Sequence, residues 1–541
     1  MDARNADKGD FVDWLLHAYA GTREIHDVTL RHPGETEDAL ARRCLVAVNE
    51  RVQAPRLLEL EAILHDLWVV PPEVWEQASD GRATLPEGFG RVPARSWSRT
   101  SRHEDTTARL NHLVLKNFRR FEQTRVVLHA GVNVLIGQNG AGKTTILDAL
   151  AMGLAGGVRP LHRDIGDAFS EARLRADDVR VARIEKGGIP TFERQLPARI
   201  DVDMLFCGEP MQAGPVAEAF GNGAVASRPG RAISFLEYTD VVRWAVQDGF
   251  DVTLPLVAYY GTGRTWRSGQ QRAFGRDDLS RLAGYDGCLD PSTNLSGMRA
   301  WFRRMELLAL QDGRTPPVLE ASKRAVLACM EGCDLVRYDA RLDDLAARFV
   351  ETGLLLGFEQ LSDGQRNMLG MVADMAYRAS TLNPHLGASA AEQTPGVVLI
   401  DEVDLHLHPA WQRRVLHDLS RAFPRLQLIV TTHSPQVLGE VPTDAVIVLA
   451  DSQPFSPPAP TAGRDSNSIL LEVLGVSAHP RETVIELEEI VRLIDDKRYD
   501  EARSRLGGLA EKLTDRDPEI RRLESLLDVV ERIDETDRQG A

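Results

Sequence analysis

The stretch GQNGAGKTT at 137–145 constrains the fold of this chain more than any other part of its sequence. It fits the pattern G-x-x-x-x-G-K-[ST], in which glycines let the backbone wrap closely around phosphate groups. The apolar run VNVLIG at 132–137 precedes it, and a segment with helical periodicity follows it. A buried parallel strand, a phosphate-binding loop and a helix N-terminus therefore occur in the order that such a site requires. We expect an α/β fold built on a parallel sheet.

The loop offers backbone N–H groups and a helix N-terminus, both of which favour a bound anion. We expect the Lys143 ammonium to reach the β- and γ-phosphates of a nucleotide, and the Thr144 hydroxyl to hold Mg²⁺. The residues of this loop predicted to contact the nucleotide are Gly137, Asn139, Gly140, Gly142, Lys143, Thr144 and Thr145.

A second segment, GVVLIDEVD at 396–404, predicts a buried strand that ends in two carboxylates, Asp401 and Glu402. An Asp at the C-terminal end of a strand beside a phosphate-binding loop is well placed to organise Mg²⁺. Glu402, one residue further on, is placed to orient and polarise an attacking water. Taken alone, the segment could equally be a strand that ends in a charged turn.

Two further segments carry candidate polar groups next to regular elements. LSDGQRNM at 361–368 begins a long apolar helix, where Ser362 and Gly364 can present a hydroxyl and N–H groups to an anion. Without the other motifs it would be a capped helix with an Asp near its N-terminus. LIVTTHSPQVL at 428–438 predicts a buried strand that leads into His433, and a lone His after a strand is usually structural.

In this order, the four segments resemble the motifs of the ABC-type ATPases. Walker A lies at 137–144, the signature at 361–365 and Walker B at 397–401, followed by the catalytic Glu402 and the switch histidine His433. DLHLHP at 404–409 takes the place of the D-loop. The resemblance implies a P-loop NTPase domain of α/β fold with a helical lobe.

The same resemblance implies an ATP-hydrolysing homodimer that uses ATP and Mg²⁺. Each ATP is held between Walker A of one subunit and the signature of the other. Thr144 and Asp401 are the implied metal ligands, and Glu402 and His433 the implied catalytic residues. Ser362, Gly364 and Gln365 are the implied contacts to the nucleotide across the interface.

Further segments indicate the branch of the family. LNHLVLKNFRRFE at 110–122 resembles the opening of RecF-like and SMC-like ATPases, although this chain has no coiled-coil insertion. VAYYGTGR at 257–264, together with the motifs above, is similar to the stand-alone ATPases of Septu-type and retron anti-phage systems. That implies control of a partner effector, most simply a nuclease. The alternatives are a RecF-like repair ATPase that binds DNA itself, a transporter motor with a membrane subunit on another chain, and a regulatory scaffold with negligible turnover.

Composition and periodicity suggest the following domain organisation. We expect a helical N-terminal extension at 1–87, a linker at 88–108, the ATPase domain at 109–450 with its helical lobe at about 265–380, a Pro/Ser-rich loop at 451–467 and a helical tail at 468–541.

The net charge of −16 means that DNA would need a local basic patch. Residues 91–125 hold nine Arg or Lys against three acidic residues. A second basic stretch comprises Arg264, Arg267, Arg272, Arg276 and Arg281. These stretches could form a track for the phosphate backbone or could be solvated loops.

Several weaker patterns favour structural roles. His406-x-His408 could be a metal pair, but its place in the D-loop favours an interface or structural role. Asp201-x-Asp203 could be a Toprim-type nuclease pair, but it lies in an alternating strand. The five cysteines form no CxxC pair. With no apolar core in MDARNADKGD and no apolar run of membrane-spanning length, we expect a cytoplasmic protein.

Overall fold

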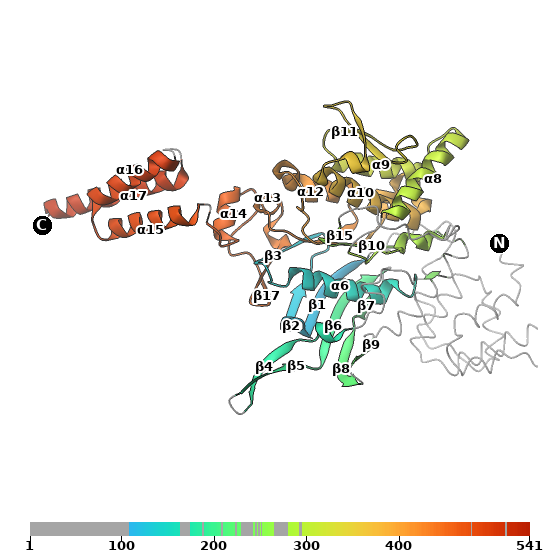
Figure 1. The fold of residues 1–541 in the computed structure, drawn as a ribbon, viewed down its shortest axis with the longest axis horizontal. Helices are drawn as coiled ribbons and strands as arrows, with labels where there is room; N and C mark the ends of the chain where they lie inside the picture. The colour runs from blue at the N-terminus through green and yellow to red at the C-terminus, as the bar shows by residue number, and fades with distance from the viewer. Residues whose placement is uncertain are drawn as a thin grey trace, which may run out of the picture. The chain divides into compact units, whose positions relative to one another are not determined.

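A computed structural model shows the fold of the chain (Figure 1). It describes residues 108–162, 174–186, 189–206, 209–221, 224–228, 242–243, 246, 249, 251–264, 280–291, 295–477, 479–513 and 517–540. The predicted extension at 1–87 and nearly all of the predicted linker lie outside these residues. The chain divides into two compact units, Met1–Ser456 and Pro457–Ala541, which are described separately. No helix in the described ranges is long and apolar enough to cross a membrane.

The core of the first unit is a six-stranded sheet with the order β10-β14-β15-β3-β16-β17. Its strands are parallel except for β17, which pairs antiparallel with β16. Every residue of β10, β14 and β15 is buried, as expected for parallel strands covered on both faces. The strands are β3 (Val132–Gly137), β10 (Leu256–Tyr260), β14 (Gly396–Ile400), β15 (Leu426–Thr431), β16 (Val446–Ala450) and β17 (Gln453–Phe455).

A second sheet is antiparallel, with the order β2-β1-β6-β8-β9 and with β7 also paired to β6. Residues of β6 alternate between buried and more exposed positions, so one face of this sheet is covered. A separate hairpin is formed by β4 and β5. The strands are β1 (Arg109–Phe118), β2 (Phe121–Val127), β4 (Val181–Lys186), β5 (Ile189–Arg194), β6 (Ala198–Phe206), β7 (Glu209–Ala213), β8 (Val216–Gly221) and β9 (Ala224–Arg228).

Helix α6 (Lys143–Val158) lies between the two sheets and packs against both (Figure 1). Most of its residues are buried on all sides, which suits a helix enclosed by two layers. The packing on β6 is close, because a Cβ added at Gly153 would lie 2.3 Å from a methyl carbon of Val202. The helix that begins in the phosphate-binding loop is therefore fixed by the core of the molecule.

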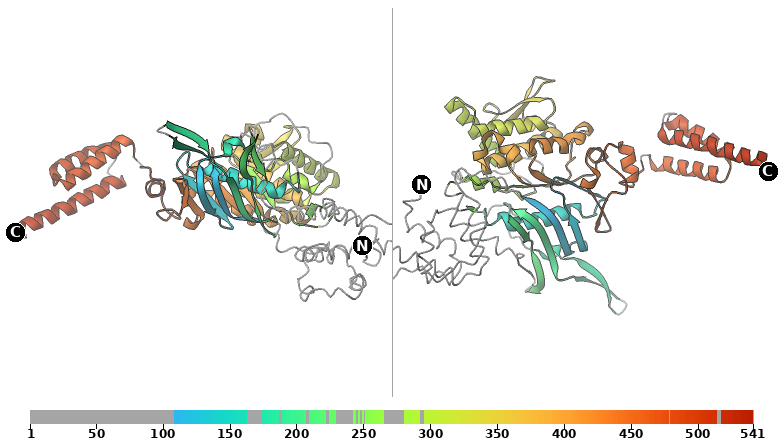
Figure 2. Two further views of the ribbon diagram at one scale, coloured as in Figure 1. Left: turned by 90° about the horizontal axis from the view of Figure 1, so that it is seen from below. Right: turned by 180° about the vertical axis from the view of Figure 1, so that it is seen from behind.

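A mostly helical lobe lies on the other side of the central sheet from the antiparallel sheet (Figure 2, right). Its helix α10 (Asp363–Leu382) packs on α9 and on β10. The lobe also contains the three-stranded antiparallel sheet β11-β12-β13, which the helical periodicity of its flanks did not predict. The other elements here are α8 (Ser296–Asp312), α9 (Pro317–Cys329), β11 (Cys333–Asp339), β12 (Asp344–Phe349), β13 (Leu355–Gly357), α11 (Ala390–Gln393), α12 (Pro409–Ala422) and α13 (Pro435–Leu438).

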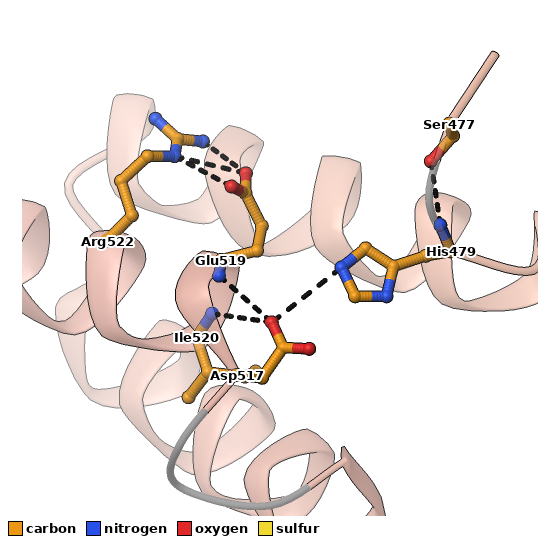
Figure 3. A network of polar contacts seen from close by, with 6 residues as sticks. All are labelled: Ser477, His479, Asp517, Glu519, Ile520 and Arg522. Atoms are coloured by element: carbon orange, nitrogen blue, oxygen red, sulfur yellow. Dashed lines mark hydrogen bonds and ion pairs between the residues drawn. The ribbon is translucent and has the colours of Figure 1, made fainter. Parts of the chain in front are cut away.

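The described residues of the second unit form four helices, α14 (Ser466–Glu472), α15 (Arg481–Asp495), α16 (Tyr499–Leu513) and α17 (Pro518–Gly540). Apolar residues of α15, α16 and α17 form one buried cluster. Figure 3 shows how α17 begins: the Asp517 carboxylate accepts hydrogen bonds from the backbone N–H groups of Glu519 and Ile520, and His479 Nε2 lies 3.7 Å from it. This cap satisfies N–H groups that a helix leaves unpaired at its start.

Candidate active site

The candidate site lies where three neighbouring strands end. β14 pairs with β15 and β15 with β3, all parallel, so their carboxyl ends meet at one edge of the sheet. The phosphate-binding loop follows β3, Asp401 and Glu402 follow β14, and His433 follows β15. Motifs that are far apart in the sequence therefore become neighbours at the edge where ligands bind in open α/β sheets.

The phosphate-binding loop depends on glycines at backbone conformations that other residues rarely adopt. Gly140 has a φ of 78° and Gly142 a φ of 103°, and a Cβ at Gly142 would lie 2.6 Å from the Phe121 ring. Lys143 Nζ donates to the carbonyl oxygens of Gly137 and Gln138, at 2.9 and 3.2 Å. Burial lowers the pKa of Lys143, although Asp401 and Glu402 oppose that effect. The loop thus encloses a cation at the start of α6.

Two hydroxyl groups hold the Asp401 carboxylate from opposite sides. Thr144 Oγ1 donates to Oδ2 at 2.8 Å, and Thr431 Oγ1 donates to Oδ1 at 2.6 Å. Asp401 is buried, whereas Thr144 is exposed. Thr144 and Asp401, the two predicted metal ligands, are therefore in direct contact. Sequence reasoning missed Thr431, whose only signal was its position at the end of a buried strand.

Glu402 has a strained backbone and a carboxylate that no described residue engages in a hydrogen bond. Its φ is 50°, in the left-handed region. Its N–H donates to Thr431 Oγ1 at 2.7 Å. His433 is exposed at the same edge of the sheet, next to Thr432, whose hydroxyl donates to Asp404 Oδ1 at 2.5 Å. Glu402 is thus half-buried on a hydrogen-bonded backbone, and His433 is exposed at the same edge.

The signature segment begins α10. Ser362 Oγ accepts from the Gln365 N–H at 3.3 Å, and Gln365 Oε1 accepts from the Ser362 N–H at 3.1 Å, which is a capping box. A Cβ at Gly364 would lie 2.6 Å from the carbonyl oxygen of His406, so the D-loop approaches α10 closely. In the described part of the chain, no hydrogen bond or ion pair joins 361–365 to the phosphate-binding loop. Ser362 itself is exposed.

The structural interpretation of the weaker patterns agrees with the contacts. His408 Nδ1 accepts from the Ala410 N–H and caps α12. Asp201 and Asp203 take the less buried alternate positions of β6, as strand alternation predicts, and His112 Nδ1 lies 3.2 Å from Asp203 Oδ2. Among the described residues, no group of three or more His, Cys, Asp or Glu could hold a metal ion.

The sequence leaves the second basic stretch open between a track for the phosphate backbone and solvated loops, and Arg264 and Arg281 fit neither alternative. Arg264 is 3% exposed and donates to the main-chain oxygens of Gly261, Asp401 and Glu402. Arg281 donates to the carbonyl oxygens of Leu382 and Val252. Both guanidinium groups are used inside the protein. The other three arginines of that stretch lie outside the described residues.

The basic residues of the first stretch, at 91–125, differ in their surroundings where the structure describes them. Arg119 is half-buried and forms ion pairs with Asp148, at 2.5 Å, and with Asp178, at 3.0 Å, so its charge is paired within the chain. Arg120 lies beside the phosphate-binding loop, with its Cδ 3.0 Å from the position of a Cβ at Gly142. The exposed basic residues of this stretch in β1 and β2 are Arg109, Lys116 and Arg125.

Comparison with known proteins agrees with this geometry. One family model, "AAA domain", matches 112–200, and another, "AAA domain, putative AbiEii toxin, Type IV TA system", matches 331–439. The chain is 24% identical over 459 residues to a protein named "Retron Ec83 probable ATPase" from Escherichia coli, covering 72% of this chain and 81% of that one. It is 33% identical over 96 residues to "Septu protein PtuA" from Bacillus thuringiensis, covering 17% and 23%.

A solved SMC head domain from Thermotoga maritima covers 63% of this chain at 17% identity, with a TM-score of 0.33, which is too low to support an argument. The fold rests instead on the strand order and on the loop that follows β3. That loop, the carboxylates beside it, the two family models and the retron and Septu relatives all agree with the predicted resemblance. The chain is an ATPase with an α/β P-loop fold, related to proteins named as a probable retron ATPase and as Septu protein PtuA.

Proposed function

We propose that this chain is a homodimeric ABC-type ATPase whose ATP-driven closure controls a partner effector, a nuclease, in bacterial anti-phage defence. The main support for a dimer is that the signature residues lie apart from the phosphate-binding loop within one chain. The phosphate-binding loop, Asp401 and Glu402 gather at one edge of the sheet, whereas Ser362 and Gly364 make no polar contact with them in the described chain. A second copy would supply the signature to each nucleotide.

In this proposal the chain binds ATP through backbone N–H groups of the loop at 137–145 and through the Lys143 ammonium. Arg120, beside that loop, adds a positive charge next to the bound phosphates. Ser362 and Gly364 of the second copy enclose the γ-phosphate from the other side. The enclosed site excludes bulk water, which strengthens each of these interactions.

The residues at the metal position fit Mg²⁺, which prefers oxygen ligands and retains several waters. Thr144 and Asp401 offer a hydroxyl and a carboxylate oxygen that already lie 2.8 Å apart. Bound there, Mg²⁺ would neutralise charge on the β- and γ-phosphates.

Hydrolysis requires a water that is aligned with the γ-phosphorus and loses a proton. The Glu402 carboxylate, which accepts no hydrogen bond in the described chain, is available to hold that water and to accept its proton. A bond forms from the water oxygen to phosphorus and the bond to the bridging oxygen breaks, giving ADP and phosphate. His433, which is exposed at the same edge, would donate a hydrogen bond to the γ-phosphate.

The names of the retron and Septu relatives support the defence role. The second candidate, a RecF-like ATPase that binds DNA itself, is favoured by one observation. Lys116 and Arg125 are both exposed on the paired strands β1 and β2. Their charges would give a binding constant with strong salt dependence.

The proposal is tested by affinity purification of the full-length Glu402→Gln variant with ATP, expressed with its native neighbouring genes. Bound proteins are identified by mass spectrometry and bound nucleic acid by gel. A nuclease that co-purifies in ATP but not in ADP supports the proposal. Recovery of DNA without a protein partner would favour the repair ATPase, and recovery of a membrane subunit would favour a transporter motor. The Lys143→Ala variant is the matched control, because it should capture nothing in an ATP-dependent way.

A further inference from the structure

Arg264 is a buried cation whose hydrogen bonds all go to groups around the catalytic turn. Nε donates to Asn367 Oδ1 at 2.9 Å, and Nη2 donates to the Glu402 carbonyl oxygen at 2.7 Å. Nη1 donates to the carbonyl oxygens of Gly261 and Asp401. A planar guanidinium with a fixed fork of donors can hold several acceptors at once in a defined geometry. One side chain thus fixes both peptide oxygens of the Asp401–Glu402 turn.

The backbone N–H groups of the same turn are also hydrogen-bonded. The Asp401 N–H donates to the Tyr260 carbonyl oxygen at 2.8 Å, and the Glu402 N–H donates to Thr431 Oγ1 at 2.7 Å. With Arg264 on the acceptor side, every polar backbone group of these two residues is engaged. The strained φ of Glu402 therefore persists because its surroundings determine it from both sides.

Asn367 connects Arg264 to the signature helix α10 and to the D-loop. It lies in α10, a few residues after Ser362, and is 2% exposed. Its Nδ2 donates to the carbonyl oxygen of Leu405 in the D-loop, while its Oδ1 accepts from Arg264. Signature helix, D-loop and catalytic turn are therefore joined through one amide and one guanidinium.

We propose that Arg264 is the positioning residue for Glu402 and that the Arg264–Asn367 pair transmits displacement of the signature helix to the catalytic turn of the same subunit. The inference rests on the proposed dimer, in which Ser362 engages the nucleotide bound by the partner. Engagement at one ATP site then adjusts Glu402 at the other. The two sites are coupled through residues that touch neither nucleotide.

The test uses the full-length chain with Mg²⁺ and ATP and compares Arg264→Lys with Arg378→Lys. Arg378 is an equally buried arginine that binds Asp374 and the carbonyl oxygens of Gly284 and Asp286, and none of these hydrogen bonds goes to Asp401 or Glu402. A lysine keeps the charge but cannot reproduce the fork. We expect Arg264→Lys to lower kcat by about tenfold or more with an ATP dissociation constant within about threefold of wild type, because positioning affects turnover more than binding. Arg378→Lys should lower the Tm but leave kcat within about threefold.

A second variant, Asn367→Ala, removes the hydrogen bond between Arg264 and the signature helix and leaves Arg264 in place. It keeps the inference testable if Arg264→Lys does not fold. It should lower the Hill coefficient for ATP toward one, and the double variant should be no slower than the slower single variant. Equal loss of kcat in Arg264→Lys and Arg378→Lys would overturn the inference, as would unchanged kcat and Hill coefficient in Asn367→Ala. Either result leaves the proposed function intact if the wild type hydrolyses ATP. A wild type without ATP turnover would overturn the proposed function and this inference together.

Discussion

Thr144 Oγ1 donates a hydrogen bond to Asp401 Oδ2 across 2.8 Å, which links the first turn of α6 to the end of β14. The two residues are far apart in the sequence and follow strands β3 and β14, which are not neighbours because β15 stands between them. Thr431, at the end of that intervening strand, donates to the other carboxylate oxygen. The contact therefore depends on the strand order of the whole central sheet.

Replacement of Asp401 by Asn should abolish most ATP turnover while leaving the fold intact. The amide keeps the shape of the side chain but removes the charge that would face Mg²⁺. We expect kcat to fall by about a hundredfold or more, in the range seen when one group that stabilises developing charge in the transition state is lost. Steady-state phosphate release at saturating Mg²⁺ and ATP measures this, with circular dichroism as the control for folding. Turnover near the wild-type rate would remove Asp401 from the metal site.

Alanine at Gly364 should disturb the contact between the signature helix and the D-loop. The added Cβ would lie 2.6 Å from the His406 carbonyl oxygen, so one of the two segments must move. We expect a loss of about 1–3 kcal/mol in stability, as for other overpacked positions, together with reduced ATP turnover. Thermal melts and ATPase assays measure the two effects.

The matched control is Gly507→Ala, in α16 of the second unit, where nothing lies within 4 Å of an added Cβ. An alanine there should stabilise the helix by up to about 1 kcal/mol. If Gly364→Ala were equally harmless, the close approach of the D-loop to α10 would be refuted.

His385 should make the stability of the protein depend on pH. Burial, aided by the nearby Arg281 charge, lowers the pKa of His385 to about 4. In the unfolded chain the imidazole binds a proton near pH 6.5, whereas in the folded chain it stays neutral until about pH 4. Protonation therefore favours the unfolded state first, and the stability present above pH 6.5 is lost as the pH falls toward 4.

We expect this group to account for about 2 kcal/mol at most, with allowance for its partial exposure. Denaturant melts of wild type and His385→Gln across pH 4–7 measure the difference. The advantage of the wild type should shrink as the pH falls. A difference that stays constant over this range would show that His385 titrates normally in the folded protein.

The sequence predicted those site residues that directly follow an apolar run or lie in the glycine-rich loop. The apolar runs before Gly137, Asp401 and His433 are buried strands, and GKTT begins a buried helix, as expected. The strands and the helix follow from local periodicity, and the loop follows from glycines that can adopt a positive φ. The α/β fold could therefore be predicted from these runs.

Arg264 could not be assigned from sequence because its partners are backbone oxygens and an amide contributed by distant segments. In a glycine-rich segment with other arginines downstream, it looked like a surface cation. The role of Thr431 could not be predicted either, since a Thr at the end of a strand matches no sequence motif. The sheet at 333–357 was missed because short strands with exposed polar residues lie between two strongly helical segments.

The most direct measurement of the central claim, a composite site shared by two copies, mixes two inactive variants. Lys143→Ala damages the phosphate-binding loop, and Ser362→Arg damages the signature. Each homodimer then has two defective sites, whereas a mixed dimer has one intact site and one with both defects. The account predicts negligible ATP turnover for each variant alone and recovery to at most about a quarter of wild type after mixing, because about half of the dimers are mixed. A mixture no more active than its two components, or full activity of Ser362→Arg alone, would contradict the account.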